Sequence, residues 1–214
     1  MFRRIYRGSV FRVKNFFPKS RGQVSETHEV GRWIKLLASL DEVSVIVEIG
    51  TWNGLGTSRL LGEGVKSRAR PDSARVIGLE ANQKLFLTAN TNLKKFEFFS
   101  VIWGTIVTES QLDNKDLSDA EKGWILQDIE DLKSTPYVLD AIPEHIDLLI
   151  LDGGEFSTWA EFQTLQHRVS KWIILDDTHT RKCKRILDEV RGSDNYSIIW
   201  TSDERNGTAV LLKN

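Results

Sequence analysis

Apolar residues follow two periodicities along the chain, and these predict strands alternating with helices. Short apolar runs predict strands at residues 43–49, 74–79, 98–103, 146–151 and 172–175. Helical spacing predicts helices at residues 25–40, 83–94, 156–168 and 181–191, one beginning at 58–61 and one centred on 117–132. Two further strands, at 196–201 and 208–212, flank Asn206-Gly207, a hairpin signal.

Strands that alternate with helices form right-handed βαβ units, so we expect one doubly wound α/β domain with helices on both faces of a mostly parallel sheet. The closing hairpin requires at least one antiparallel strand. We assign this domain to residues 25–214. Residues 1–24 form a basic arm with seven Lys or Arg and no acid. The arm either contacts a membrane surface, a partner or a second subunit, or it packs its aromatic side chains on the domain.

Composition and charge narrow the function classes. A formal net charge of −1 gives no general attraction to nucleic acid, so we expect no nucleic-acid partner. One cysteine, Cys183, excludes an internal disulfide and favours a reducing compartment. We find no apolar run of the roughly 18 residues that a membrane span needs and no apolar leader, so we expect a cytoplasmic protein without a transmembrane segment. Residues 108–147 hold eleven acids against three lysines and are longer than a plain crossover, so part of them should cover a site.

The first predicted strand runs through Glu48 into a loop with three glycines, Gly50, Gly54 and Gly56. Ligands of doubly wound sheets bind beyond the carboxyl ends of the strands, where this loop should lie. The spacing differs from the dinucleotide fingerprint G-x-G-x-x-G, and a carboxylate here would repel a pyrophosphate but attract a cation. Glu80, at the end of the second strand, can accept hydrogen bonds from ribose hydroxyls. S-adenosylmethionine combines a sulfonium, an ammonium and a nucleoside.

The stretch from Glu48 to Gly56 (EIGTWNGLG) resembles the glycine-rich motif of class I S-adenosylmethionine-dependent methyltransferases. The resemblance covers roughly residues 43–212 and implies a Rossmann-like sheet of seven strands, with the last strand inserted antiparallel. It implies that the cofactor is bound by Glu48, Gly50, Thr51, Trp52, Gly54 and Glu80. Many members carry an acid after the third strand to meet the adenine, whereas this chain has Trp103-Gly104-Thr105. Trp103 either borders the adenine or belongs to the core.

Acids also follow the fourth and fifth strands. Asp152, Asp176 and Asp177 should face one crevice, where they would repel one another unless protonated or neutralised by a cation. Hard oxygen ligands suit Mg²⁺, Mn²⁺ or Ca²⁺. The arrangement is similar to cation-dependent O-methyltransferases, including the catechol type, which implies that these three aspartates hold a divalent ion that activates the acceptor hydroxyl. In the alternative interpretation, Asp176 or Asp177 caps the following helix.

Two residues are candidate general bases beside Asp152. Glu155 stands where the catechol-type enzymes have a lysine, and His179 follows the aspartate pair; His179 is otherwise a surface or capping residue. LDGGEFSTWAEF followed by WIILDDTHTRKCKRI resembles small methyltransferases of polysaccharide and glycoside modification.

The expected function is therefore metal-assisted, S-adenosylmethionine-dependent O-methylation of a sugar, a glycan or another small hydroxylated acceptor. Trp103, Trp124, Trp159 and Trp172 offer ring faces to a sugar, although tryptophans of this kind, Trp33 and Trp172 above all, also suit a core. The alternatives are a methyltransferase for amines, proteins or RNA, and a non-catalytic nucleotide-binding domain.

Overall fold

The computed structural model describes residues 23–214. Residues 1–22 of the predicted basic arm lie outside the described range, so the expectations for the arm stay predictions. The last residues of that predicted arm already belong to the domain. Val24 is buried in the core, and the Gln23 side chain donates a 2.6 Å hydrogen bond to Asn53 Oδ1 in the glycine-rich loop.

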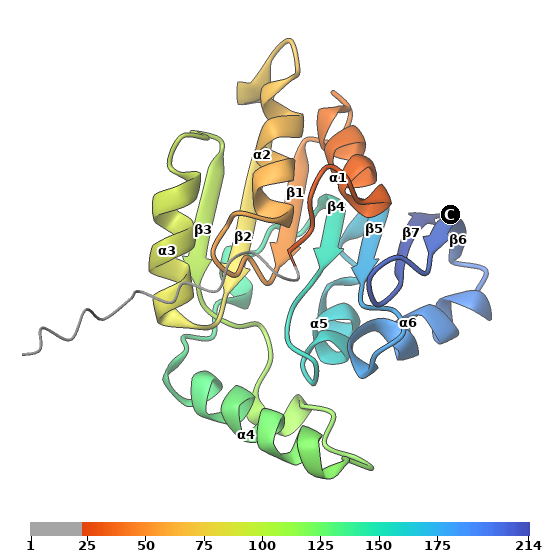
Figure 1. Cartoon of the computed structure of the whole chain (residues 1–214). Coiled ribbons are helices and arrows are strands. Elements are labelled where there is room, and N and C mark those ends of the chain that lie inside the picture. The colour runs from red at the N-terminus through yellow and green to blue at the C-terminus, as the bar shows by residue number, and fades with distance from the viewer. Residues whose placement is uncertain (1–22) are drawn as a thin grey trace, which may run out of the picture.

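The described residues form one seven-stranded sheet (Figure 1). Its strands are β1 (Val45–Ile49), β2 (Arg75–Glu80), β3 (Phe99–Trp103), β4 (Ile146–Leu151), β5 (Val169–Asp176), β6 (Tyr196–Ser202) and β7 (Thr208–Lys213). They lie in the order β3-β2-β1-β4-β5-β7-β6, and β7 runs antiparallel to both of its neighbours. Strands β1 to β5 pair in parallel. The predicted doubly wound fold, with an antiparallel terminal strand, is confirmed.

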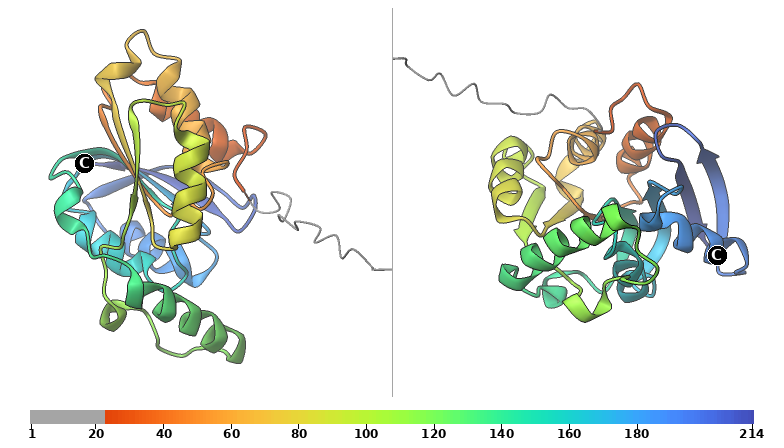
Figure 2. Two further views of the ribbon diagram at one scale, coloured as in Figure 1. Left: turned by 90° about the vertical axis from the view of Figure 1, so that its left-hand side faces the viewer. Right: turned by 60° about the horizontal axis from the view of Figure 1, so that its bottom comes forward.

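Helices cover both faces of the sheet (Figure 2). One layer consists of α1 (Glu29–Ser39), α2 (Thr57–Lys66) and α3 (Gln83–Leu93); the other consists of α5 (Thr158–Leu165) and α6 (Arg181–Arg191). Alternate residues of a strand point to opposite faces, so neighbouring residues of β4 enter different cores: Leu148 and Ile150 pack under α1 to α3, and Leu149 and Leu151 pack against α5 and α6.

The first helix begins later than its sequence predicts. The backbone N–H of Ser25 donates to His28 Nδ1 (3.0 Å), and the N–H of His28 returns a 3.1 Å bond to the Ser25 carbonyl. This turn places His28 at the N-cap, so α1 starts at Glu29 rather than Ser25.

Helix α4 (Asp119–Ser134) lies beyond the end of the sheet, apart from the two helical layers (Figures 1 and 2). Ser118 and Glu121 form a capping box at its N-terminus. The helix buries only Ile125, which packs with Leu112 and Phe156 in a small separate core. Its place beyond the strands agrees with the expectation that the acidic segment covers a site.

Among residues 23–214, no helix is long and apolar enough to cross a membrane.

Candidate active site

The loop between β1 and α2 contains residues with positive φ angles, a backbone conformation that few residue types adopt readily. Gly50 adopts φ +88°, and a Cβ on it would lie 2.2 Å from the backbone oxygen of Asp152. Trp52 adopts φ +48°, a rare conformation for a bulky residue. The N–H groups of Gly50 and Thr51 donate to the Leu79 carbonyl at 2.9 and 3.1 Å, which ties the loop to the end of β2. Gly50 therefore allows three strand ends to approach closely.

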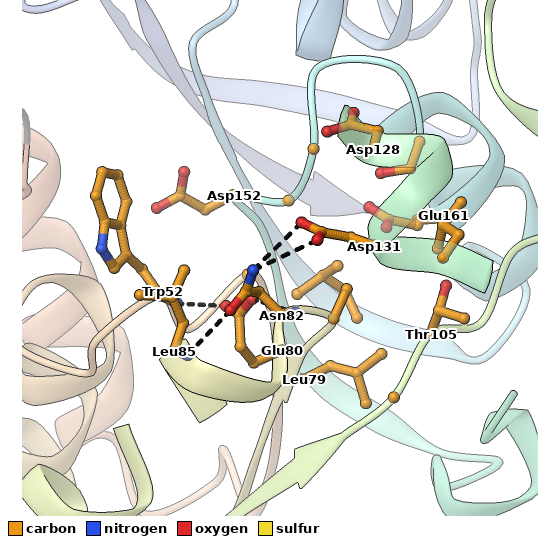
Figure 3. Close-up of a pocket in the computed structure, with 18 of the residues that line it drawn as sticks. Trp52, Leu79, Glu80, Asn82, Leu85, Thr105, Asp128, Asp131, Asp152 and Glu161 are labelled. Atoms are coloured by element: carbon orange, nitrogen blue, oxygen red, sulfur yellow. Dashed lines mark hydrogen bonds between the residues drawn. The ribbon is translucent and has the colours of Figure 1, made fainter. Parts of the chain in front are cut away.

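Glu80 is the last residue of β2 and is held by this loop (Figure 3). One carboxylate oxygen accepts from the Trp52 N–H at 2.7 Å, and the other accepts from the Asn82 N–H at 2.9 Å. Burial raises the pKa of Glu80 to about 7, against the lowering effect of these hydrogen bonds. The carboxylate is thus fixed, and half-exposed Trp52 lies beside it.

A cavity of about 360 Å³ opens beyond the carboxyl ends of β1, β2 and β4 (Figure 3). This volume suits a small-molecule ligand. The walls come from the loop after β1, the end of β2, the segment after β3, helix α4 and the loop after β4. Their residues include Gly50, Trp52, Glu80, Asn82, Thr105, Asp128, Asp131, Asp152, Gly153 and Glu161.

A second cavity, of about 180 Å³, adjoins the first and shares Gly50, Trp52, Asp152 and Gly153 with it. Glu48 lines this smaller cavity and is fully buried. Neither of its carboxylate oxygens has a hydrogen-bond partner in the described part of the chain. Burial raises the pKa of Glu48, as do the nearby charges of Asp152 and Glu80. A buried carboxyl without a partner is costly, so this position calls for a donor or a cation from a ligand.

Three further acids line the larger cavity. None of them was predicted as a site residue from the sequence. Asp128 and Asp131 project from α4, and burial raises the pKa of Asp128 to about 6. Asp131 accepts from the Asn82 side chain at 3.4 Å. Glu161, on α5, is buried with an unpartnered Oε2, and burial raises its pKa to about 7. The acid-rich composition of residues 108–147 was the signal for the two α4 residues; Glu161 had none.

The three predicted metal ligands do converge. Oxygen atoms of Asp152, Asp176 and Asp177 all lie within 4.8 Å of one another. Burial and the charge of Asp152 raise the pKa of Asp176 to about 7. Asp177 adopts φ +60°, which an aspartate tolerates better than most residues. The convergence follows from parallel strands β4 and β5 ending at the same edge of the sheet.

Two basic side chains that were not predicted as site residues contact these three aspartates. Lys182 Nζ, from the first turn of α6, lies 2.7 Å from Asp152 Oδ1 and 2.8 Å from Asp177 Oδ2. Arg205, from the turn between β6 and β7, lies 3.2 Å from Asp176 Oδ2. Burial acts to lower the pKa of Lys182, but the aspartates outweigh it and hold that pKa above its usual range. The three carboxyl groups are therefore already neutralised in part by protein cations.

Four of the predicted site residues lie away from both cavities. His179 is about half exposed and faces Asp203, with Nε2 3.2 Å from Oδ1. Glu155 accepts hydrogen bonds from the Thr180 hydroxyl (3.2 Å) and from the backbone N–H of Lys182 (3.3 Å). Both of its carboxylate oxygens are therefore engaged at the N-terminus of α6, where Glu155 acts as a helix cap. The capping role considered for Asp176 or Asp177 thus falls to Glu155.

The other two, Trp103 and Gly54, have structural contacts. The Trp103 indole N–H donates to the Ala81 carbonyl at 3.0 Å, and Trp103 is not among the residues that line the larger cavity. Gly54 adopts φ +76° and approaches Leu93 of α3. Thr51 lines the smaller cavity, as does Glu48.

Comparison with known proteins gives matches only in structure. No family model and no curated protein sequence matches the chain. The O-methyltransferase from Bacillus cereus, solved with SAH, aligns over 90% of this chain and 83% of its own, with 18% identity and a TM-score of 0.60. The O-methyltransferase TomG from Streptomyces achromogenes, solved with SAM, aligns over 86% and 78%, with 14% identity and a TM-score of 0.58.

A third structure with this fold is named for a different methylation reaction. The precorrin-6y C5,15-methyltransferase from Geobacter metallireducens aligns over 92% of both chains, with 13% identity and a TM-score of 0.58. The chain therefore has the fold of the class I S-adenosylmethionine-dependent methyltransferases, as the resemblance of its glycine-rich loop implied. Fold alone does not define an acceptor, and the site has to supply that argument.

Proposed function

We propose that the protein is an S-adenosylmethionine-dependent O-methyltransferase. The observation that carries this proposal is the pair of glutamates on either side of the Gly50 turn: Glu80, fixed by two backbone N–H groups, and Glu48, buried without a partner. Each lines one of two adjoining cavities. Two acids in adjoining cavities suit a ligand with a ribose at one end and a positive charge at the other.

The residues present fit this cofactor. Glu80 would accept hydrogen bonds from the ribose hydroxyls, and Glu48 would meet the ammonium group. Gly50 lines both cavities, and because it has no Cβ the Asp152 backbone can lie directly against it. When bound, S-adenosylmethionine supplies an electrophilic methyl group, and the acceptor oxygen forms a bond to this carbon as the bond from carbon to sulfur breaks.

Asp152 is the residue that we place nearest to the acceptor, because it lines both cavities. Its Oδ1 is engaged by Lys182, whereas its Oδ2 has only a long 3.4 Å contact with the Thr57 hydroxyl. This second oxygen is free to accept the proton of an acceptor hydroxyl. We therefore assign Asp152 the role of general base, in preference to Glu155 or His179, which face other partners.

The site fits assistance by a divalent metal ion less well than it fits a general base. Carboxylate oxygens are suitable donors for a divalent ion, but the ammonium group of Lys182 already contacts two of the three aspartates. The proposed reaction therefore depends on the protein's own side chains and on the cofactor.

We further propose a small hydroxylated acceptor, with sugars and glycans first. Among the tryptophans expected to contact a sugar, Trp124 on α4 is exposed, and Trp52 adds an exposed ring at the cavity. Trp159 is covered by the Arg185 guanidinium, 3.8 Å from its ring centroid. Trp33 and Trp172 pack against the core. The support therefore rests on two rings and the surrounding carboxylates.

An amine acceptor is the second candidate. Asp128, Asp131 and Glu161 surround the larger cavity, and none of the residues that line it is Lys or Arg. Such a wall attracts a cationic acceptor as well as a cationic cofactor.

A panel of acceptors tests the proposal. The protein is incubated with S-adenosylmethionine and with monosaccharides, glycans, catechols or amines, and release of S-adenosylhomocysteine is measured together with the product mass. A hydroxylated compound that gains one methyl group supports O-methylation. Exclusive transfer to amines would replace the leading candidate by the second. Asp152→Asn should lower kcat strongly with little change in cofactor affinity.

A further inference from the structure

The aspartate cluster contains charged groups that leave little room for a metal ion. Its six carboxylate oxygens belong to Asp152, Asp176 and Asp177, and four of them accept hydrogen bonds of 3.2 Å or less from side chains. The donors are the Lys182 ammonium, which bonds two of the oxygens, the Arg205 guanidinium and the Asn206 amide. Within residues 23–214, only Asp152 Oδ2 and Asp176 Oδ1 are left without such a bond, so a divalent ion that needs six or more oxygen ligands would have to displace some of these donors to gain further carboxylate ligands.

Lys182 is the most enclosed of the donors. Its side chain is 7% exposed and lies in the first turn of α6, between the ends of β4 and β5. A divalent ion that bound Asp152 Oδ1 at about 2.1 Å would lie no more than about 5 Å from the Lys182 nitrogen. Like charges this close repel each other strongly at a site shielded from water. Ion and ammonium therefore compete for one place.

Arg205 supplies a second positive charge to the aspartate cluster, from a different element of the fold. It belongs to the turn between β6 and β7, adopts φ +64° and contacts Asp176 Oδ2. The three aspartates thus receive one cation from α6 and another from the hairpin. Both arrive by tertiary packing, since neither residue is a sequence neighbour of Asp152.

We propose that Lys182 is the resident cation of the aspartate cluster and takes the place of a divalent metal ion. Lys182 is a positioning residue: it neutralises Asp152 and Asp177 and fixes the orientation of Asp152, whose second oxygen faces the acceptor. This inference goes beyond the proposed function, because cation binding can be measured without any methyl transfer.

The test is a thermal-unfolding titration of the protein with Mn²⁺, Mg²⁺ or Ca²⁺ and with a chelator. We expect no saturable stabilisation of the wild-type protein. Lys182→Met keeps the aliphatic stem and removes the charge, which frees two carboxylates. We expect this variant to gain Mn²⁺ binding, with a rise in Tm on the order of 5 °C at millimolar Mn²⁺. Mn²⁺ electron paramagnetic resonance should report the same gain.

Matched variants separate this effect from a general change of charge. Lys184→Met removes an exposed lysine of the same helix, which pairs with Asp188, and should gain no Mn²⁺ binding. Lys182→Arg keeps a cation and should also gain none. Adding Asp177→Asn to Lys182→Met should abolish the gain.

Saturable Mn²⁺ binding by the wild-type protein that Asp152→Asn removes would overturn the proposal. So would a folded Lys182→Met protein without any gain of ion binding. If Lys182→Met does not fold, the wild-type titration still decides the question, because the proposal requires that titration to be flat. Failure of the wild-type protein to transfer a methyl group to any acceptor would contradict the proposed function. It would not affect the interpretation of these ion titrations.

Discussion

Gly50 has the least freedom to change of the residues at the site. Its φ of +88° is a conformation that L side chains rarely adopt, and an added Cβ would overlap the Asp152 backbone. Gly50→Ala should therefore lower the free energy of unfolding by more than about 3 kcal/mol and abolish cofactor binding. Urea denaturation checks the first effect and calorimetry the second. Gly123→Ala is the control: a Cβ there meets nothing within 4 Å, so helix α4 should be stabilised by up to about 1 kcal/mol. A stable Gly50→Ala protein that binds normally would contradict our description of the loop.

Glu80 permits a test of the cofactor assignment itself. Glu80→Gln removes a charged acceptor at the ribose position, so affinity for S-adenosylmethionine should fall about 10- to 100-fold. Isothermal titration calorimetry measures this change. The control is Glu109→Gln, an exposed position outside both cavities, which should leave the affinity unchanged. Equal affinities of the wild-type protein and Glu80→Gln for S-adenosylmethionine would show that Glu80 does not bind the cofactor.

Sequence reasoning located residues whose role depends on the local chain better than residues whose role depends on packing. Glu48 lies near the end of a predicted strand, and Gly50 and Glu80 follow predicted strands, so their place at the edge of the sheet could be inferred. Lys182 and Glu161 look like ordinary helix residues, and only packing of α6 and α5 against the strand ends brings them to the cavities. His179 shows the converse: it follows the aspartate pair, yet the hairpin turn directs its ring toward Asp203.

Among the helices, α4 has the weakest attachment to the domain. It buries only Ile125. Arg181 of α6 pairs with Glu121 in the first turn of α4 at 3.1 Å and with Asp113, in the segment that precedes α4, at 3.3 Å. Because these ion pairs are partly exposed to solvent, each contributes little to stability. Elements with few buried contacts open more readily than the core.

Arg181→Gln should therefore speed amide hydrogen exchange in α4 about 3- to 10-fold, with little change in the strands. Exchange measured by mass spectrometry checks this, and bound S-adenosylmethionine should slow it, since Asp128 and Asp131 line the larger cavity. Arg191→Gln, at the far end of α6, should leave α4 unchanged. If Arg181→Gln affected all elements equally, Arg181 would support the whole fold and not α4 in particular.

At this scale the sequence predicted the order of strands and helices, because the change from a period of two to helical spacing is strong in buried elements. The ends of elements were less accurate. The start of α1 depends on the His28 ring, which accepts the Ser25 N–H. Helix α5 spans Thr158–Leu165 and is shorter at both ends than the predicted 156–168.

For the whole molecule, the clustered acids predict an unusual pH dependence of stability. Burial raises the pKa of Glu80, Glu161 and Asp176 to about 7 and that of Asp128 to about 6. Between about pH 4.5 and 7 the unfolded chain has released these protons while the folded protein still holds them. The free energy of unfolding therefore falls as pH rises through this window.

We expect the unliganded protein to lose at least about 2 kcal/mol between pH 5 and pH 8, measured by urea denaturation. Asp177 has a lowered pKa and acts in the opposite sense, but its contribution is complete above its unfolded pKa near 4. Glu161→Gln should flatten the slope. A stability that rises steadily from pH 5 to pH 8 would contradict the buried acidic site.

Calorimetric titration of the wild-type protein with S-adenosylmethionine and, separately, with NAD⁺ tests the central claim most directly. The two cavities beside Glu48 and Glu80 predict saturable binding of S-adenosylmethionine and no heat with NAD⁺, whose pyrophosphate would meet the buried carboxylates. The absence of heat with S-adenosylmethionine, or comparable binding of NAD⁺, would contradict the account.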